Sequence, residues 1–560
     1  MASIQPMNGD GIFRGPASKS PKIMKTIGQL FMELCDKHPE KIFQIEADTG
    51  EKESYAHAKQ RAVRLACALK KDNLVQPGDT TMVCSENTIH NIIPILATIF
   101  LGGSAASIDP MESVEEMAGA LAYSEPKIIF TEKKSAGMLK EAHKELEAKN
   151  NQRYQVAFFV IGADEKIDGD VERIEDFALP CPEENNFQLH PQDSFDTAIY
   201  VFTSGTTSLP KPVALSHYGV LHGFKCLVDE MDNVNPEVIT HFASLYWISA
   251  ILLTGVTLSH GGTKVIAPKI PALNLLEYIE KYQITFAFMP NTYTYDITKL
   301  PAEIIAQHDT SSLYSIAVAG SPMDASQLRK MRATLPQTKV TMIYGSTECT
   351  AISAFDLQDF KAYEEKILSS GKALITRGFQ IVDLETRCLL PANEVGEILV
   401  RSPYMMKGYH EKCIVFPKSP LDETGFLKTG DLGFFDSDNY LFVTDRINDT
   451  FKYKTYQVSP LSIERVLLEH AAVKSAVAFN VFHEQDRNHA AAIVTLKPGF
   501  EGSAEEIKAF ANARLSEKHK IRAKVWIREQ IPYKTRTGKV QRAHIREEFS
   551  KKMQEECTQS

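Results

Sequence analysis

The sequence predicts an α/β protein with a large N-terminal domain, made of two α/β subdomains and a small β-rich subdomain, followed by a small α+β C-terminal domain. Three observations support this fold class. Short apolar runs alternate with helical patterns through most of the chain, which favours largely parallel sheets. Short strands separated by turns replace that pattern from about Gly396 to Thr444. After Asp445 a new unit of helices and strands begins.

The alternating part contains apolar runs that are typical of buried strands, and segments with helical spacing lie between them. The expected strands are 80–86, 127–132, 155–162, 195–205, 263–268, 284–290, 313–320 and 340–345, and the clearest helices are 54–72 and 272–282. In the β-rich part the expected strands are 396–403, 426–436 and 439–445. In the last unit, 459–473 and 503–518 are expected helices, the second opening with a Ser-x-x-Glu capping box, and 474–482 and 490–498 are expected strands.

The composition is that of an ordinary globular protein, with 43% apolar and 24% charged residues. The formal net charge of -9 gives no indication of nucleic-acid binding, which favours a strongly basic face. The nine cysteines include no CxxC pair, which argues against a disulfide framework and a structural zinc site. A reducing compartment is expected.

Neither end of the chain carries a recognisable targeting signal. The first 24 residues lack the apolar segment of a secretory signal and are expected to form a disordered arm. The longest apolar stretch, 91–108, is interrupted by Pro94, Gly102, Gly103 and Ser104, so a buried helix running into a buried strand explains it better than a membrane span. The last residues lack a Ser-Lys-Leu tail, which favours the cytoplasm over the peroxisome.

The stretch YVFTSGTTSLPKPVALSH, residues 200–217, indicates a phosphate-binding loop. A strand ends where a cluster of hydroxyl residues and Gly205 begins, and Lys211 follows. Glycine allows close approach of the backbone, successive N–H groups form an anion cradle, and the lysine adds positive charge. The spacing excludes a Walker A loop. Taken alone, the same residues could form an ordinary surface turn.

Further motifs, in a fixed order, decide against a simple turn. Together with the loop they resemble the adenylate-forming superfamily, which includes acyl-CoA synthetases, 4-coumarate–CoA ligases, beetle luciferases and peptide-synthetase adenylation domains. The resemblance covers about residues 25–550. The motifs are VAGSPMD (318–324), YGSTECT (344–350), GEILVRSPYMMKGYH (396–410), KTGDLGFFD (428–436), DRINDTFKYKTYQVSP (445–460) and PYKTRTGKVQR (532–542).

The resemblance implies an ATP site assembled from several of these motifs. The loop would grip the β- and γ-phosphates, Glu348 would hold Mg2+, Thr347 would donate to the α-phosphate, and Tyr344 would stack on adenine unless it merely packs. Asp431 would bind both ribose hydroxyls, and Arg446 would reach ribose or phosphate unless it only pairs with Asp445. The implied ATP-binding residues are Thr203, Ser204, Gly205, Thr206, Thr207, Lys211, Gly320, Ser321, Tyr344, Gly345, Thr347, Asp431, Arg446 and Lys539.

The resemblance also implies a moving C-terminal domain. Lys539, in the turn RTGK, would contact the carboxylate and the α-phosphate during adenylation. The domain would then rotate so that Lys452 approaches and the CoA thiol attacks the acyl-adenylate. The expected division is an adenylation domain over 25–445, a hinge over 446–449 and a C-terminal domain over 450–560.

Three regions depart from the superfamily pattern or leave the substrate open. Lys454 and Thr455 lie where relatives place the pantetheine tunnel, and Thr455 replaces a glycine there, so CoA transfer is expected to be slow, absent or rearranged. An apolar acyl or aryl pocket is expected around Tyr246, Trp247, Ile248 and Phe288, although Trp247 could equally be a core aromatic. Pro212 replaces another glycine, and a stiffer phosphate loop is expected.

The sequence therefore predicts an ATP-, Mg2+- and CoA-dependent ligase for a hydrophobic carboxylic acid, either medium-chain fatty or aryl, with no nucleic-acid partner and no integral membrane segment. A luciferase-type oxygenase that uses the same adenylation step is one alternative. A catalytically impaired relative that only binds adenylate or acyl groups is another. The identity of the acid and the oligomeric state stay open.

Overall fold

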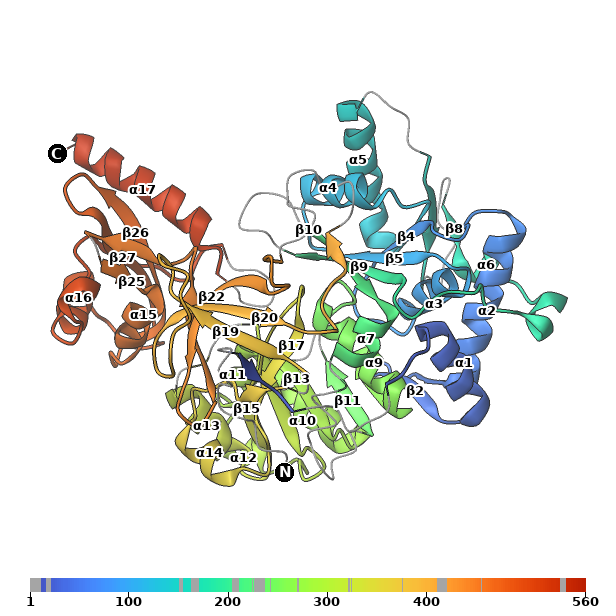
Figure 1. Ribbon diagram of the computed structural model, residues 1–560, viewed down its shortest axis with the longest axis horizontal. Coiled ribbons are helices and arrows are strands. Elements are labelled where there is room, and N and C mark those ends of the chain that lie inside the picture. The colour runs from blue at the N-terminus through green and yellow to red at the C-terminus, as the bar shows by residue number, and fades with distance from the viewer. Residues whose placement is uncertain are drawn as a thin grey trace.

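The structure is a computed structural model that describes the chain except for residues 1–11, 17–21, 151–154, 163–170, 204–210, 224, 226–236, 242, 269–270, 321–322, 324, 375, 410–420, 455, 534–539 and 560. It is a mixed α/β protein in which a large N-terminal domain is joined to a small C-terminal domain. Figure 1 shows the C-terminal domain at one end of the molecule, beyond the β-rich part. The predicted fold class is confirmed.

The first α/β subdomain is built on an eight-stranded sheet. Its central strands are parallel, and only the pairs that β10 makes with β9 and β21 are antiparallel. In sheet order the strands are β21 (Gly408–Tyr409), β10 (Lys211–Ser216), β9 (Thr197–Thr203), β5 (Ser104–Ile108), β4 (Thr80–Cys84), β6 (Ile128–Thr131), β7 (Ala157–Val160) and β8 (Glu172–Arg173).

The second α/β subdomain is built on a seven-stranded sheet that is parallel except for its last pair. In sheet order the strands are β15 (Lys339–Met342), β14 (Ser315–Ala319), β13 (Phe286–Pro290), β11 (Val238–His241), β12 (Thr263–Ile266), β2 (Ile42–Glu46) and β3 (Lys52–Ser54). Parallel pairing explains the continuous apolar runs, because helices cover both faces of such sheets.

The helices of these two subdomains include both that the sequence predicted most clearly. They are α1 (Ile27–Lys37), α2 (Tyr55–Lys71), α3 (Ile92–Phe100), α4 (Val114–Ser124), α5 (Lys133–Asn150), α6 (Ile174–Phe177), α7 (His217–Gly223), α9 (Ile248–His260), α10 (Ala272–Tyr282), α11 (Asn291–Ile297), α12 (Ala302–Ile305), α13 (Ala325–Thr334) and α14 (Phe360–Glu365), with a 3-10 turn at Pro182–Asn186. The apolar stretch 91–108 forms the buried helix α3 and then the buried strand β5, as predicted.

The β-rich part is a five-stranded antiparallel sheet, with a three-stranded sheet beside it. The first contains β1 (Phe13–Arg14), β19 (Gly378–Val382), β20 (Gly396–Arg401), β22 (Leu427–Phe435) and β23 (Leu441–Arg446), and the second β16 (Tyr344–Ser346), β17 (Thr350–Ala354) and β18 (Lys372–Ala373). The expectation of a disordered arm over residues 1–24 is wrong for residues 12–16. There β1 pairs with β19 and Phe13 stacks on Phe435, because the sheet offers an unpaired edge and an apolar site for one ring.

The C-terminal domain packs helices against a three-stranded sheet. The sheet contains β26 (Val473–His483), β27 (Arg487–Leu496) and β28 (Val525–Ile527), and a separate two-stranded ribbon, β24 (Phe451–Tyr453) and β25 (Tyr456–Val458), precedes it. Its helices are α15 (Pro460–Leu468), α16 (Ala504–Asn512) and α17 (Arg542–Gln559), with a 3-10 turn at Glu517–His519. Ser503 caps α16 by accepting from the N–H of Glu506, which is the N-cap half of the predicted capping box.

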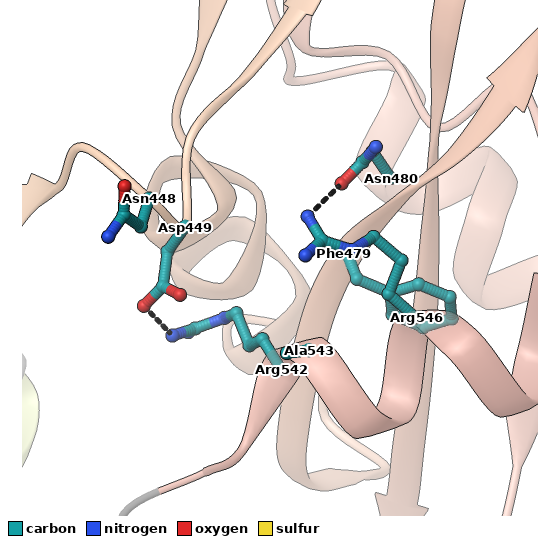
Figure 2. Close-up of a pocket in the computed structure, with 7 residues that line it drawn as sticks. All are labelled: Asn448, Asp449, Phe479, Asn480, Arg542, Ala543 and Arg546. Atoms are coloured by element: carbon teal, nitrogen blue, oxygen red, sulfur yellow. Dashed lines mark hydrogen bonds and ion pairs between the residues drawn. The ribbon is translucent and has the colours of Figure 1, made fainter. Parts of the chain in front are cut away.

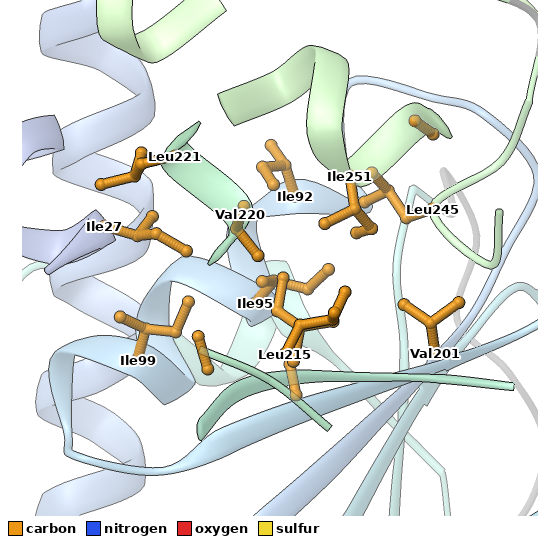
Figure 3. Packing of buried hydrophobic residues seen from close by; sticks show 14 of the residues in the cluster. Ile27, Ile92, Ile95, Ile99, Val201, Leu215, Val220, Leu221, Leu245 and Ile251 are labelled. Carbon is orange, nitrogen blue, oxygen red and sulfur yellow. The ribbon is translucent and has the colours of Figure 1, made fainter. Parts of the chain in front are cut away.

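The largest core lies between the eight-stranded sheet and helices α1, α3, α7 and α9. Figure 3 shows Ile92, Ile95 and Ile99 of α3 facing Val201 and Leu215 of the sheet. Burial of each such side chain contributes roughly 1.5–3 kcal/mol, so this face anchors strand β9, which ends at Thr203 just before the predicted phosphate loop. Among the described residues, no helix is both long enough and apolar enough to cross a membrane.

Candidate active site

The predicted phosphate loop joins two paired strands. Strand β9 ends at Thr203, β10 begins at Lys211, and these two residues are direct partners across the antiparallel pair. Residues Ser204, Gly205, Thr206 and Thr207 lie outside the described residues. Pro212 belongs to β10, opposite Phe202, rather than to the loop itself. The strand that precedes the expected loop and the strand that follows it therefore meet at the same end of the β9–β10 pair.

Lys211 and Glu348 are linked through a residue that sequence reasoning did not single out. The Lys211 Nζ lies 5.8 Å from the centre of the Tyr409 ring, within range of a cation–π contact. The Tyr409 hydroxyl in turn donates to Glu348 Oε1 at 3.4 Å. Strand β21, which carries Tyr409, pairs with β10 and so brings Tyr409 to Lys211. The N–H of Met406, just before β21, donates to the Glu348 carbonyl at 2.9 Å and holds Glu348 beside the same strand.

Thr347 and Glu348 lie on a tight turn between β16 and β17. The turn requires Gly345, because a Cβ there would lie 2.4 Å from the carbonyl oxygen of Thr350. Thr350 itself has a φ of 66°. Both Thr347 and Glu348 are half-buried on this turn. A half-buried carboxylate that shares one oxygen with a hydroxyl fits a hard cation such as Mg2+.

Tyr344, Asp431 and Arg446 form a second group, which we call the nucleotide cluster. The Tyr344 hydroxyl donates to Asp431 Oδ2 at 2.6 Å, and the Arg446 Nε lies 3.0 Å from Asp431 Oδ1. The side chains come from β16, β22 and β23. The Arg446 guanidinium pairs with Asp431, whereas the Arg446 backbone N–H donates to Asp445 Oδ1 at 2.8 Å.

The electrostatics of the nucleotide cluster follow from burial and from the Asp431 charge. Burial first, and then the Asp431 carboxylate, raise the pKa of Tyr344 well above its ordinary value, so its hydroxyl stays a donor. The Asp431 charge raises the pKa of Arg446. Asp431 is buried, and its own N–H donates to Thr429 Oγ1 at 3.1 Å. A buried carboxylate held in this way suits the recognition of paired hydroxyl groups.

Gly320 directly follows β14 at the carboxyl edge of the seven-stranded sheet, where ligands of parallel sheets commonly bind. Its φ is 90°, and a Cβ at this position would meet nothing within 4 Å. Glycine is therefore favoured here because its backbone adopts the left-handed region, and a side chain would not be excluded by neighbouring atoms. Open space on that side is compatible with the predicted contact to adenine. Ser321 lies outside the described residues.

The segment that leads into the C-terminal domain is bonded on both sides. Ile447 donates to the carbonyl of Gly430, and the Ser459 hydroxyl donates to the buried Asp445. Arg542 forms ion pairs with Asp449 at 3.0 Å and with Glu464 at 2.7 Å. Figure 2 shows Arg542 paired with Asp449, and both residues line a cavity of about 290 Å³.

Lys452 and Lys454, which are predicted to act after domain rotation, pair with residues outside the nucleotide cluster. Lys452 is on β24 and forms an exposed ion pair with Glu385 at 3.2 Å. Lys454 has a φ of 53°, and its ammonium lies 3.7 Å from Asp486 Oδ1. Lys539 and Thr455 lie outside the described residues.

The predicted acid-pocket residues fall into two neighbouring apolar clusters. Tyr246 and Trp247 pack in one, with their rings edge to face at 5.2 Å, and Ile248 and Phe288 pack in the other. Tyr246 is 4% exposed, so it is a core residue as well as a candidate pocket residue.

Glu112, which sequence reasoning missed, hydrogen-bonds Tyr246 and Glu116. Burial, aided by Glu116, raises the pKa of Glu112 to about 8. No sequence signal singles out Glu112 among the many surface carboxylates. Tyr409 is different, because it lies within the stretch 396–410 that resembles a superfamily motif.

Comparison with known proteins supports the same assignment from sequence and from fold. The family model for AMP-binding enzymes matches residues 31–410, and that for the AMP-binding enzyme C-terminal domain matches residues 462–539. The chain is 29% identical to 4-coumarate–CoA ligase 1 of Petroselinum crispum over 513 residues, which is 90% of each chain.

Two solved structures illustrate the range of similar proteins. The luciferase-like enzyme from the nonluminescent Zophobas morio mealworm is 30% identical, with a TM-score of 0.72 over 79% of this chain and all of that one. The amide bond synthetase McbA from Marinactinospora thermotolerans is 25% identical, with a TM-score of 0.79 over 93% of this chain and 99% of that one. Because family models match both domains of the chain, the chain belongs to the AMP-binding enzymes of the adenylate-forming superfamily, within the CoA ligase and luciferase-like group.

Proposed function

We propose that this chain is an ATP-dependent acid–thiol ligase that converts a hydrophobic carboxylic acid, medium-chain fatty or aryl, into acyl-AMP and passes the acyl group to CoA. The observation that carries this proposal is that the nucleotide cluster and the Lys211–Tyr409–Glu348 group meet at the turn over 344–350. One group suits a ribose and the other suits charged phosphates. Adenylation needs both at once, because two anions must be held together.

In the first half-reaction, a carboxylate oxygen of the acid attacks the α-phosphorus of ATP, and pyrophosphate leaves with the electrons of the broken P–O bond. Lys211 and the loop over 203–207 hold the outer phosphates, and Thr347 donates to the α-phosphate. Asp431 and Arg446 hold the ribose, and Tyr344 and Gly320 border the base. Glu348 is the residue that would hold Mg2+, which supplies charge neutralisation on the phosphates when it is bound.

Lys539 is proposed to bridge the acid carboxylate and the α-phosphate in this step. The hinge over 446–449 then turns the C-terminal domain, which occupies 450–560, against the domain over 25–445. Lys452 approaches in its place, the CoA thiolate attacks the acyl carbonyl, and AMP leaves. The exposed Lys452–Glu385 pair favours this exchange, because exposed ion pairs contribute little and separate easily.

The hydrophobic acid is inferred from the apolar clusters around Tyr246, Trp247, Ile248 and Phe288. The name of the parsley relative, 4-coumarate–CoA ligase, favours an aryl acid. Two observations bear on the acceptor: Thr455 stands where a glycine is expected, and a similar protein is an amide bond synthetase. Rates of thioester formation in the native chain and in Thr455→Gly test whether this threonine narrows the tunnel.

Pyrophosphate release across a panel of medium-chain and aryl acids, with and without CoA, tests the proposal directly. A ligase releases pyrophosphate with a subset of acids and forms a thioester only with CoA. Replacement of Lys539 by Ala should abolish acyl-AMP formation. Undiminished acyl-AMP in that variant, or no acid-dependent release at all, would contradict the proposal; the second result would favour a protein that only binds adenylate or acyl groups.

A luciferase-type oxygenase that uses the same adenylation step is the second candidate, because the chain is similar to a luciferase-like enzyme, the source of which is itself nonluminescent. It would emit light with luciferin and ATP, and the proposed ligase would not.

A further inference from the structure

The β26–β27 hairpin carries two histidines and an aspartate that no step of adenylation uses. His483 ends β26, Asp486 lies in the turn, and His489 is the third residue of β27. One nitrogen or oxygen atom from each of these side chains lies within 4.8 Å of the others. We propose that His483, Asp486 and His489 bind one divalent transition-metal ion of the Zn2+ class, and that this ion stiffens the adjoining segment that carries Lys452 and Lys454.

The distances between the three side chains fit a site that closes around an ion by small rotations. His489 Nε2 is 2.8 Å from Asp486 Oδ2, and His483 Nδ1 is 3.9 Å from the same oxygen. The two imidazole rings stack at 3.8 Å between centres. Ligand atoms around a tetrahedral Zn2+ with bonds of about 2.0–2.1 Å lie roughly 3.3 Å apart, between the two observed distances.

The donor set selects the kind of metal. Two imidazoles and one carboxylate suit Zn2+, Co2+, Ni2+ or Cu2+, whereas Mg2+ and Ca2+ prefer sites made only of oxygen ligands. The histidine and aspartate side chains are between 18% and 38% exposed, so an ion can reach them from solvent and keep a water ligand. The hairpin site is therefore distinct in chemistry from the carboxylate of Glu348.

Three existing contacts compete with an ion. His489 gives up its hydrogen bond to Asp486, and the N–H of Asp486 already donates to His483 Nδ1 at 3.2 Å. The Lys454 ammonium, 3.7 Å from Asp486 Oδ1, repels a second cation. The affinity is therefore below that of a structural site with four protein ligands, and removal of the lysine charge should increase it.

Backbone hydrogen bonds carry the effect of the ion to the neighbouring ribbon. The N–H of Lys454 donates to the Asp486 carbonyl at 2.8 Å, and the Asn488 side-chain amide donates to the Lys452 carbonyl at 2.8 Å. An ion that fixes Asp486 also fixes the acceptor of the Lys454 amide. Hydrogen exchange at that amide should then slow when the ion binds.

The test uses the full chain after treatment with a chelator, without nucleotide or CoA. Calorimetric titration with Zn2+ and visible absorption with Co2+ should show that one ion binds per chain and that its binding requires the three hairpin side chains. His489→Gln and Asp486→Asn should each weaken that binding at least tenfold. His519→Gln, a histidine of the same domain outside the site, should leave it unchanged. Lys454→Gln should tighten binding at least threefold, which also keeps the test decisive should a ligand variant fail to fold.

No saturable binding at about 100 μM ion, or equal binding in all variants, would overturn the proposed site. Binding that depends on the three side chains but leaves exchange at the Lys454 amide unchanged would overturn the proposed stiffening. None of these readouts depends on which acid or acceptor the chain uses. Failure of the ligase proposal would therefore leave them unaffected.

Discussion

The nucleotide cluster and the ribbon Phe451–Val458 differ in how firmly the structure holds their charged side chains. In the cluster, both Asp431 oxygens are engaged, and the carboxylate is buried. On the ribbon, Lys452 is 44% exposed and its partner Glu385 is 81% exposed. Buried charge-assisted bonds hold a geometry, whereas exposed pairs contribute about 0–1 kcal/mol. The first region holds its charged side chains in a fixed arrangement, and the second holds them weakly.

Among the variants that test this contrast, Asp431→Asn is expected to have the largest effect. The variant keeps the shape but removes the charge that holds Arg446 and one acceptor for the ribose. Loss of such a bond to a charged group amounts to about 2–3 kcal/mol, so kcat/KM for ATP should fall roughly 30- to 160-fold in acid-dependent ATP–pyrophosphate exchange. Asp438→Asn, at an exposed carboxylate after the same strand, should stay within about twofold. Equal loss in both would mean that Asp431 has no special role.

Lys452→Gln sharpens the contrast from the other region. If the ribbon acts only after rotation, the rate of thioester formation divided by the rate of ATP–pyrophosphate exchange should fall about tenfold, because one charge near the reacting group is removed. Single-turnover transfer from preformed acyl-AMP measures the second half-reaction alone. Lys551→Gln, at an exposed lysine of the same domain, provides the matched control. A ratio that does not change would place Lys452 outside the chemistry.

Tyr409→Phe should have a smaller effect, which is confined to the Mg2+ dependence of the adenylation step. It removes the hydroxyl that donates to Glu348, a bond of about 1 kcal/mol, and keeps the ring beside Lys211. The Mg2+ concentration for half-maximal exchange activity should therefore shift about three- to fivefold, because the Glu348 carboxylate loses the group that orients it. Tyr456→Phe, on the exposed ribbon, should not shift it. An effect of equal size in both variants would remove Tyr409 from the site.

The smallest effect is expected for Glu112. Its partner Glu116 also interacts electrostatically with His544, on α17 of the C-terminal domain. The folded-state pKa of Glu112 is raised by burial from 4.5 to about 8. Its protonated form therefore stabilises the fold fully below about pH 4.5, and this stabilisation is lost as pH rises through about 8. Because Glu112 is partly exposed, solvent screening reduces this stabilisation, and the expected change in Tm is about 1 °C.

Glu112→Gln keeps an uncharged side chain at this position at every pH. The fall in Tm between about pH 5 and pH 8 should therefore be smaller in the variant than in the native chain. Thermal unfolding at the two pH values measures the difference. A steeper fall in the variant would reverse the assigned direction of the shift.

Local chemistry made much of the fold predictable. Strand β9 ends at Thr203, where hydroxyl residues and a glycine follow the apolar run, and the stretch 91–108 divides into helix and strand where Gly102 and Gly103 interrupt it. The strand Phe13–Arg14 was not predictable, because two residues carry no periodicity and their partner strand begins at Gly378. The roles assigned to Lys539, Thr455 and the loop over 204–207 stay predictions.

The sequence by itself determined the fold class, the superfamily and most of the residues expected to touch ATP, because strand periodicity, glycine positions and ordered motifs are local properties of the chain. Only the tertiary structure decided that Arg446 pairs with Asp431, that Tyr409 links Lys211 to Glu348, and that two histidines and an aspartate converge beside Lys454. Such pairings depend on which strands lie side by side and on how deeply each charge is buried, and neither is encoded in a short stretch of residues.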